Sequence, residues 1–355
     1  MHGSGHSAGM SSTGQARPSV AAPVPRAPGT SDGTADPADR VDRAADALRR
    51  LALDETAKQR AAVDPVLRGL GKRVARRYIA GERREDALAR ARSVNDAGHA
   101  VTIDYMGEST RDRAEADAAT AEFVRLAEDL ASSDVRASVS LDLSHVGSVV
   151  DRAVGLANAA RIAEATARAS VEMLISMEGH DRTDQILEDH GQLCERFDHV
   201  GVTVQARLHR TESDIAVLLR RPGRVRLVKG AYDMPLDVAL ARDDPETHAR
   251  YDRQAAWLIR SGHECSIATH DPERLHAVHR LVTDESLQDR PYLIEVLSGI
   301  GPGQLDHMHR LGHPTQEYLV YGSEWWLYVC NRIAEDPLRL FDALLDAADT
   351  GRRQA

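Results

Sequence analysis

The feature that most constrains this 355-residue chain is an eightfold alternation of short apolar runs with longer amphipathic stretches. Short runs rich in β-branched residues predict buried strands, whereas apolar residues recurring every three or four positions predict helices. The predicted strands cover residues 100–105, 137–143, 171–177, 201–208, 224–230, 264–269, 292–297 and 315–321. The predicted helices that follow them cover 111–131, 150–169, 183–197, 212–220, 244–261, 272–282, 301–311 and 324–335.

This alternation predicts the class of the fold. A strand, a helix and a second strand in succession form a right-handed βαβ unit, which makes the two strands parallel. Eight such units predict an α/β protein with a (β/α)8 TIM-type barrel. An open doubly wound sheet competes, but a dinucleotide-binding one usually has a G-x-G-x-x-G turn after its first strand, which is lacking here. We expect the barrel to span residues 98–350, with a final helix, 338–348, packed over one end.

The region before residue 98 has a different pattern. Residues 1–35 are rich in Gly, Ser, Ala and Pro and lack apolar periodicity, which predicts a disordered leader outside the fold. Residues 36–97 form a predicted N-terminal helical arm, in which Asp36 is the expected N-cap of the first helix and Pro37 its first residue. The helices of the arm are predicted at 37–54, 63–80 and 84–97.

Composition narrows the class of function and the compartment. The net charge of −10 argues against a general nucleic-acid binder, which needs a basic face for phosphate contacts. The chain has neither a signal segment nor an apolar run near the ~20 residues that span a bilayer, although peripheral membrane contact stays open. Cys194, Cys265 and Cys330 lie far apart and show neither metal-ligand spacing nor a disulfide framework. We therefore expect a cytoplasmic protein with no metal site.

The ends of the predicted strands carry many polar residues, and in barrels of this kind the carboxyl ends of the strands carry the chemistry. The strand-end residues are Asp104, Glu108, Asp142, His145, Ser176, Glu178, Gln205, Arg207, Arg226, Lys229, Tyr232, Thr269, His270, Asp271, Glu295, Tyr318 and Tyr321. The last predicted barrel helix adds Tyr328, Arg332 and Glu335 on one face. Convergence of this set on one rim predicts a functional site there.

The stretch RVRLVKGAYDMP, from Arg224 to Pro235, is the most informative of these strand ends. Arg226 and Lys229, one of only three lysines, suggest a bound anion such as a pyrophosphate or an electron-rich flavin edge. Gly230 would let that group lie against the backbone. Another interpretation is a barrel aldolase with Lys229 as its Schiff-base lysine, because Arg226 nearby would lower the pKa of that amine.

Two other strand ends fit a dinucleotide cofactor. Gln205 can form hydrogen bonds with a flat heteroaromatic edge, while Thr269 and His270 can hold a phosphate or a ribose.

Five stretches, in order and at matching spacing, resemble the proline dehydrogenase family. Residues 226–233 are similar to the family signature R-L-V-K-G-A-Y-W. VTIDYMGES is similar to a first strand that ends in L-G-E, TVQARL to V-Q-x-Y-L, and IATHD to A-T-H-N. YLVYGSEWWLYVCNRIAE is similar to Y-x-P-Y-G-x-x-W-x-x-Y-x-x-R-R-x-x-E. The resemblance covers about residues 64–336.

The resemblance implies an FAD-dependent barrel enzyme that oxidises proline to 1-pyrroline-5-carboxylate and passes electrons to a quinone or another acceptor. The implied FAD contacts are Gln205, Arg226, Lys229, Gly230, Ala231, Thr269, His270, Arg332 and Glu335. The implied walls of the substrate pocket are Tyr232, Tyr318 and Tyr328. Arg332 is also implied to hold the substrate carboxylate.

Three departures from the family pattern are serious, and all three belong to the substrate side. Asn331 stands where the family has the first of two adjacent arginines, Asp142 stands in place of a lysine, and Ser176 in place of an acidic residue. Two unit charges ~4 Å apart at an effective dielectric constant of ~20 interact by roughly 4 kcal/mol. A reversed charge therefore changes affinity by ~10³-fold.

We accordingly predict that free L-proline is a poor substrate. A small-molecule amine whose carboxylate is absent, masked or replaced by an amine suits Asp142 better. Two alternatives stay open: Asp142 pairs with Arg332 or another arginine within an ordinary proline site, or the protein is a non-catalytic relative that binds flavin.

Overall fold

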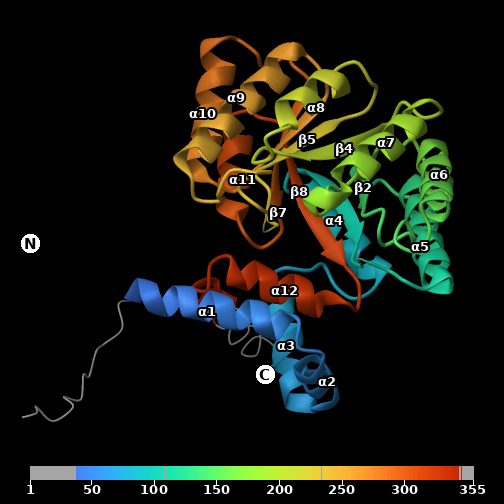
Figure 1. Cartoon of the computed structure of the whole chain (residues 1–355), viewed down its shortest axis with the longest axis vertical. Coiled ribbons are helices and arrows are strands. Elements are labelled where there is room, and N and C mark those ends of the chain that lie inside the picture. The colour runs from blue at the N-terminus through green and yellow to red at the C-terminus, as the bar shows by residue number, and fades with distance from the viewer. Residues whose placement is uncertain (1–36, 108, 233, 344, 346–355) are drawn as a thin grey trace, which may run out of the picture.

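The computed structural model describes residues 37–107, 109–232, 234–343 and 345 (Figure 1). Eight parallel strands form a closed barrel in chain order, and β8 closes on β1. The strands are β1 Ala100–Tyr105, β2 Ala137–Leu141, β3 Met173–Ile175, β4 Val200–Gln205, β5 Val225–Val228, β6 Cys265–Ala268, β7 Tyr292–Leu297 and β8 Thr315–Tyr321. The predicted (β/α)8 barrel is confirmed.

A helix follows each strand, and the local sequence explains where several of them begin. The helices are α5 Arg113–Ala131, α6 Arg152–Arg168, α7 Thr183–Cys194, α8 Thr211–Leu218, α9 Pro245–Ser261, α10 Pro272–Asp284, α11 Pro302–Arg310 and α12 Trp325–Ala334. The carboxylates that precede α5, α6, α9 and α10 accept hydrogen bonds from backbone N–H groups of the first turn. Such caps satisfy donors that have no partner within the helix.

The two faces of the barrel sheet differ in polarity. The outer face is aliphatic and packs against the helices, with residues such as Ile103, Leu141 and Leu227 fully buried. The inner face places Thr102 of β1, Arg226 of β5 and Glu295 of β7 in contact across the barrel. Alternation along each strand sends successive side chains to opposite faces, so this polar interior follows from the sequence.

The N-terminal arm contains one helix more than predicted. It consists of α1 Pro37–Ala52, α2 Glu55–Val63, α3 Pro65–Ala75 and α4 Arg84–Asp96. Asp64 ends α2 and caps α3, and Pro65 then occupies the first turn of α3, so the break follows ordinary cap chemistry. The expected N-cap Asp36 lies outside the described residues.

The last arm helix, α4, packs against the barrel at β1 and β8. Ala87, Leu88, Ala91 and Val94 of α4 are buried in the main core with residues of β1. The first three helices of the arm contribute no residue to this main core.

A second apolar cluster covers the carboxyl end of the barrel. It joins Val74 of α3, Tyr78 after α3, Val320 of β8, Ile333 of α12 and Ala343 near the C-terminus. Figure 1 shows α1 lying along α12 at the end of the barrel toward which β8 points. The predicted final helix begins at residue 339 and is described only as far as 343, apart from 345. None of the described helices is long and apolar enough to cross a bilayer.

Candidate functional site

The mouth of the barrel brings a carboxylate and a phenol together. The Tyr318 hydroxyl of β8 donates a 2.6 Å hydrogen bond to Oδ2 of Asp104 on β1. Burial raises the pKa of Asp104 to about 6, although the Tyr318 hydrogen bond and the positive charge of Arg226 act in the opposite direction. The pKa of Tyr318 is raised by burial and by the Asp104 and Asp142 carboxylates. The charges of both acidic strand ends therefore act on the same phenol.

Arg226 lies one layer deeper, and its contacts correct our reasoning about it. We expected its charge to indicate a bound anion, but the structure supplies an anion from the protein. Its Nε lies 3.0 Å from Oε2 of Glu295, and the two side chains are only 3% and 2% exposed. Nη1 and Nη2 donate to Ser140 (3.1 Å) and Thr102 (3.3 Å). The guanidinium carbon is 5.0 Å from the centre of the Tyr318 ring, so Arg226 supports the floor of the mouth.

Gln205, at the end of β4, has an unused acceptor. The side chain is 1% exposed, and its Nε2 donates to the carbonyl of Glu178 at 3.0 Å. Its Oε1 is buried and has no hydrogen-bond partner among the described residues. Gly230 faces this oxygen at a φ of +110°, and a Cβ there would lie 3.1 Å from Oε1. Because buried acceptors are rarely left unpaired, this pair fits a flat ligand with an N–H group on its edge, as a flavin has.

A group of cations surrounds His270 at the end of β6. Burial, together with the positive charges of Arg339, Arg332 and Lys229, lowers the pKa of His270 to about 4. His270 is therefore neutral at pH 7 in a positive environment, which suits phosphate groups. Thr269 lies beside it, with its hydroxyl accepting a hydrogen bond from the backbone N–H of Asp271.

Sequence reasoning missed Arg339, which follows the last motif. The signal was the position of Arg339, four residues after Glu335. Nη1 of Arg339 lies 3.7 Å from the Glu335 carboxylate.

The predicted face of α12 is confirmed and lies over this mouth. Nη2 of Arg332 is 2.6 Å from Oε1 of Glu335, and its guanidinium carbon is 5.5 Å from the centre of the Tyr328 ring. Burial raises the pKa of Tyr328 to about 12. The charge of Arg332 acts in the opposite direction, whereas the acids Glu335 and Asp104 raise the pKa as burial does. The Tyr328 hydroxyl and Nε of Arg332 are buried without hydrogen-bond partners among the described residues. They are available to a bound molecule.

The three serious departures from the family pattern lie after β2, after β3 and on α12. Ser176 Oγ lies 3.1 Å from Ser140 Oγ, the same hydroxyl that accepts from Arg226. Asp142 is partly buried beside Tyr318, and Asn331 is partly buried on α12. Ala231 and Tyr232 lie on the loop after β5, where Tyr232 is 40% exposed.

Several strand-end residues have structural roles instead. His145 packs against Tyr105 and Phe123, and burial lowers its pKa to about 4. Glu178 accepts from the backbone of Ser144, and Tyr321 donates to Glu122 outside the barrel. Asp271 caps α10. Glu108 lies outside the described residues.

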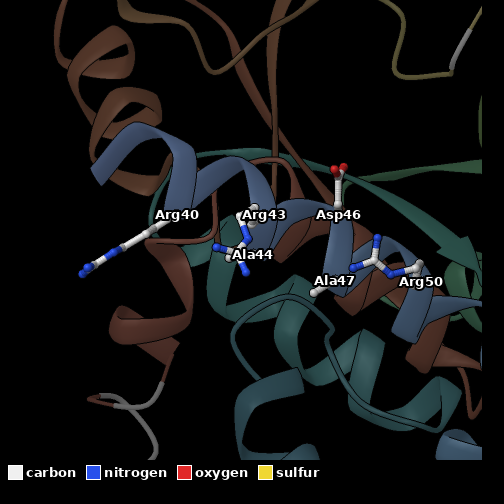
Figure 2. Close-up of a pocket in the computed structure, with 6 residues that line it drawn as sticks. All are labelled: Arg40, Arg43, Ala44, Asp46, Ala47 and Arg50. Atoms are coloured by element: carbon white, nitrogen blue, oxygen red, sulfur yellow. The ribbon is translucent and has the colours of Figure 1, made fainter. Parts of the chain in front are cut away.

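Two further observations help to delimit the site. The described residues contain no group of three or more His, Cys, Asp or Glu side chains arranged to hold a metal ion. Figure 2 shows a surface hollow whose lining residues all belong to α1: Arg40, Arg43, Ala44, Asp46, Ala47 and Arg50. Ligand sites usually collect polar groups from several elements, so the mouth of the barrel is the better candidate.

Comparison with known proteins agrees with this placement. The proline dehydrogenase family model matches residues 87–327. Proline dehydrogenase 1 of Bacillus subtilis (strain 168) is 28% identical over 263 residues, which cover 74% of this chain and 87% of the relative. Proline dehydrogenase of Deinococcus radiodurans is 30% identical over 287 residues, which cover 79% and 92%.

Solved structures share the fold. Proline utilization A (PutA) from Bdellovibrio bacteriovorus, in a structure inactivated by N-propargylglycine, superposes with a TM-score of 0.69 at 19% identity. The match covers 83% of this chain but only 36% of that chain, so this protein spans about a third of that PutA. With the family match over residues 87–327, the chain belongs to the proline dehydrogenase family of oxidoreductases.

Proposed function

We propose that this protein is an FAD-dependent oxidoreductase that oxidises a C–N bond of proline or of a proline-like amine. The observation that carries the proposal is the buried, unpaired Oε1 of Gln205 facing Gly230 at the mouth of the barrel. A flavin edge has an N–H group that could donate to this acceptor, and the chain belongs to a family of oxidoreductases.

In this proposal, different residues around the mouth bind different parts of the FAD dinucleotide. Gln205 accepts from the ring system, with Gly230 and Ala231 against it through their backbone. Lys229, Arg332, Thr269 and His270 serve the phosphates and sugars, and Glu335 accepts from a hydroxyl. Arg226 contributes positive charge from below, because its N–H groups already serve Glu295, Ser140 and Thr102.

When bound, FAD would supply a two-electron acceptor for the hydride that leaves the carbon next to the amine. The remaining work falls to the protein. Tyr318 and Tyr328 line a pocket poor in water, which holds the reacting carbon in place. Above a pH of about 6, Asp104 is ionised and accepts from Tyr318. It is then placed to accept an N–H of a neutral amine as well. A quinone or another acceptor would then reoxidise the cofactor, by contact at a membrane surface or in solution.

The charges of the site favour an altered substrate. The charges of Asp104 and Asp142 both act on Tyr318, and Nη2 of Arg332 is paired with Glu335. A carboxylate beside these acids would be repelled. We therefore propose a proline-like amine whose carboxylate is absent, masked or replaced by an amine.

The test is a flavin-reduction screen on purified protein reconstituted with FAD. L-Proline, proline methyl ester, pyrrolidine and 2-(aminomethyl)pyrrolidine are mixed with it under anaerobic conditions, and bleaching of the flavin absorbance is followed. We expect the carboxylate-free amines to bleach it faster than L-proline. Gln205→Ala should weaken FAD binding, whereas Gln185→Ala, on α7, should not.

Each competing interpretation predicts a different result in this screen. Protein that takes up no FAD would refute the proposal, and borohydride trapping of a carbonyl substrate on Lys229 would then favour the aldolase. FAD binding without reduction by any amine would favour a non-catalytic relative.

A further inference from the structure

The loop after β5 carries residues of the proposed site yet buries little apolar surface. Its described residues are 229–232 and 234–244, which include Gly230, Ala231 and Tyr232. Tyr232 is 40% exposed and Leu236 72%, while Ala239 is fully buried. Segments with few buried apolar contacts open easily, so polar contacts must hold this loop in place.

One buried arginine makes three of those contacts with its side chain. Arg207 follows β4 and is 3% exposed. Its Nε donates to the carbonyl of Leu240 at 2.8 Å, and its Nη1 donates to the carbonyls of Gly230 (3.3 Å) and Tyr232 (3.1 Å). Both ends of the loop are thereby tied to a single guanidinium group.

Backbone hydrogen bonds, His209 and a second arginine add to the attachment. The N–H of Arg207 donates to the carbonyl of Lys229 at 3.2 Å, and its carbonyl accepts from the N–H of Leu240 at 3.0 Å. The guanidinium of Arg242 donates to the carbonyl of Ala231. Three successive carbonyls, from Gly230 to Tyr232, are therefore held by arginine side chains.

The other side of this loop meets the proposed cofactor site. A Cβ at Gly230 would lie 3.1 Å from Oε1 of Gln205, the unpaired acceptor. Gln205 and Arg207 are two residues apart, so one short segment presents the acceptor and fixes the loop that faces it. We propose that Arg207 is a positioning residue that holds this loop in the conformation that receives the cofactor. The identity of the cofactor as FAD rests on the proposed function.

The chemistry of the anchor calls for arginine. A guanidinium is planar, always charged and has five N–H donors, so it can serve several carbonyls at once. Lysine has a more mobile point charge, and tyrosine, the residue of the V-Q-x-Y-L motif at this position, has a single O–H donor. The anchor is therefore a feature of this chain beyond the family motif.

Loss of the anchor has a defined effect on binding. If only the ordered loop binds the cofactor, the apparent affinity falls in proportion to the population of that ordered state. By reciprocity, bound FAD must restore order to a loosened loop. A residue with a merely structural role would lower the stability of the whole protein without this coupling.

The experiment compares Arg207→Ala and Arg207→Lys with wild type and with Arg210→Ala. Arg210, at the start of α8, is a matched control. Its guanidinium pairs with Asp184 of α7 and with Asp214 of α8. FAD affinity is measured by quenching of flavin fluorescence. Loop opening is measured by limited chymotrypsin digestion, with cleavage after Tyr232 and Leu236 mapped by mass spectrometry, with and without FAD.

We expect Arg207→Ala to weaken FAD binding by at least about tenfold and to speed cleavage within the loop, with FAD restoring protection. Arg207→Lys should be intermediate and Arg210→Ala should match wild type. The proposal would be overturned if Arg207→Ala kept FAD affinity and loop cleavage within twofold of wild type. It would also be overturned if the faster cleavage were spread evenly over the chain.

Two further outcomes are also decisive. If Arg207→Ala does not fold, Arg207→Lys carries the same comparison. If wild type binds no FAD, the proposed function fails, but cleavage of the cofactor-free variants still shows whether Arg207 anchors the loop.

Discussion

The buried pair between Arg226 and Glu295 allows a quantitative prediction. Both side chains are almost completely removed from solvent. Burial lowers the pKa of Arg226, but Glu295, Tyr318 and Glu172 together raise it above its ordinary value. Glu295→Gln keeps the size of the side chain but leaves a buried cation without its counter-charge. Removing one partner of a buried pair costs about 3–5 kcal/mol. We expect that loss in the free energy of unfolding, a large share of the ~5–15 kcal/mol of an ordinary protein.

Urea unfolding followed by circular dichroism measures this loss, with Glu246→Gln as the matched control. Glu246 pairs with Arg253 on the surface, where both side chains are about half exposed, and such pairs contribute about 1 kcal/mol or less. Adding Arg226→Met to Glu295→Gln should recover much of the lost stability, because the unpaired charge is then gone. A Glu295→Gln variant no less stable than Glu246→Gln would refute the reasoning.

Three other predictions follow from the mouth of the barrel. Burial raises the pKa of Asp104 from 3.8 to about 6, so the protonated form stabilises the fold and that contribution is lost as the pH rises through about 6. Urea unfolding between pH 4 and 7 should therefore show wild type losing stability relative to Asp104→Asn as the pH rises, and parallel curves would contradict this. Gly230→Ala should weaken FAD binding about tenfold, because strain at positive φ costs about 1–3 kcal/mol and disfavours the loop conformation that receives FAD. Gly303→Ala, which has open space around it, should have no effect in the same fluorescence titration. Asp142→Lys combined with Asn331→Arg should raise L-proline turnover by up to ~10³-fold; unchanged turnover in a steady-state dye assay would show that these positions do not bind the carboxylate.

The sequence predicted the elements well because each element has a local signal. Strand periodicity and helix caps depend on neighbouring residues, and the spacing of Tyr328, Arg332 and Glu335 placed them on one face of α12. The break between α2 and α3 also had a local signal, Asp64-Pro65, which the apolar pattern of the arm concealed.

The partners of charged residues could not be predicted in the same way. Alternation shows that Arg226 points into the barrel, but not that Glu295, two strands away, meets it there. The contact depends on the closure of all eight strands. The role of Arg207 depends likewise on the path of a loop, which the residues of β4 do not encode.

The polar interior of the barrel also bears on how the fold assembles. A shift of β5 by one residue would expose the guanidinium of Arg226 to the aliphatic helix layer and send Leu227 into the lumen, since neighbouring side chains point to opposite faces. Arg226 reaches its partners on β1, β2 and β7 only when the sheet has curled round far enough to bring them together. Half-formed barrels are therefore penalised by an unpaired charge, which favours all-or-none closure and selects the native strand register.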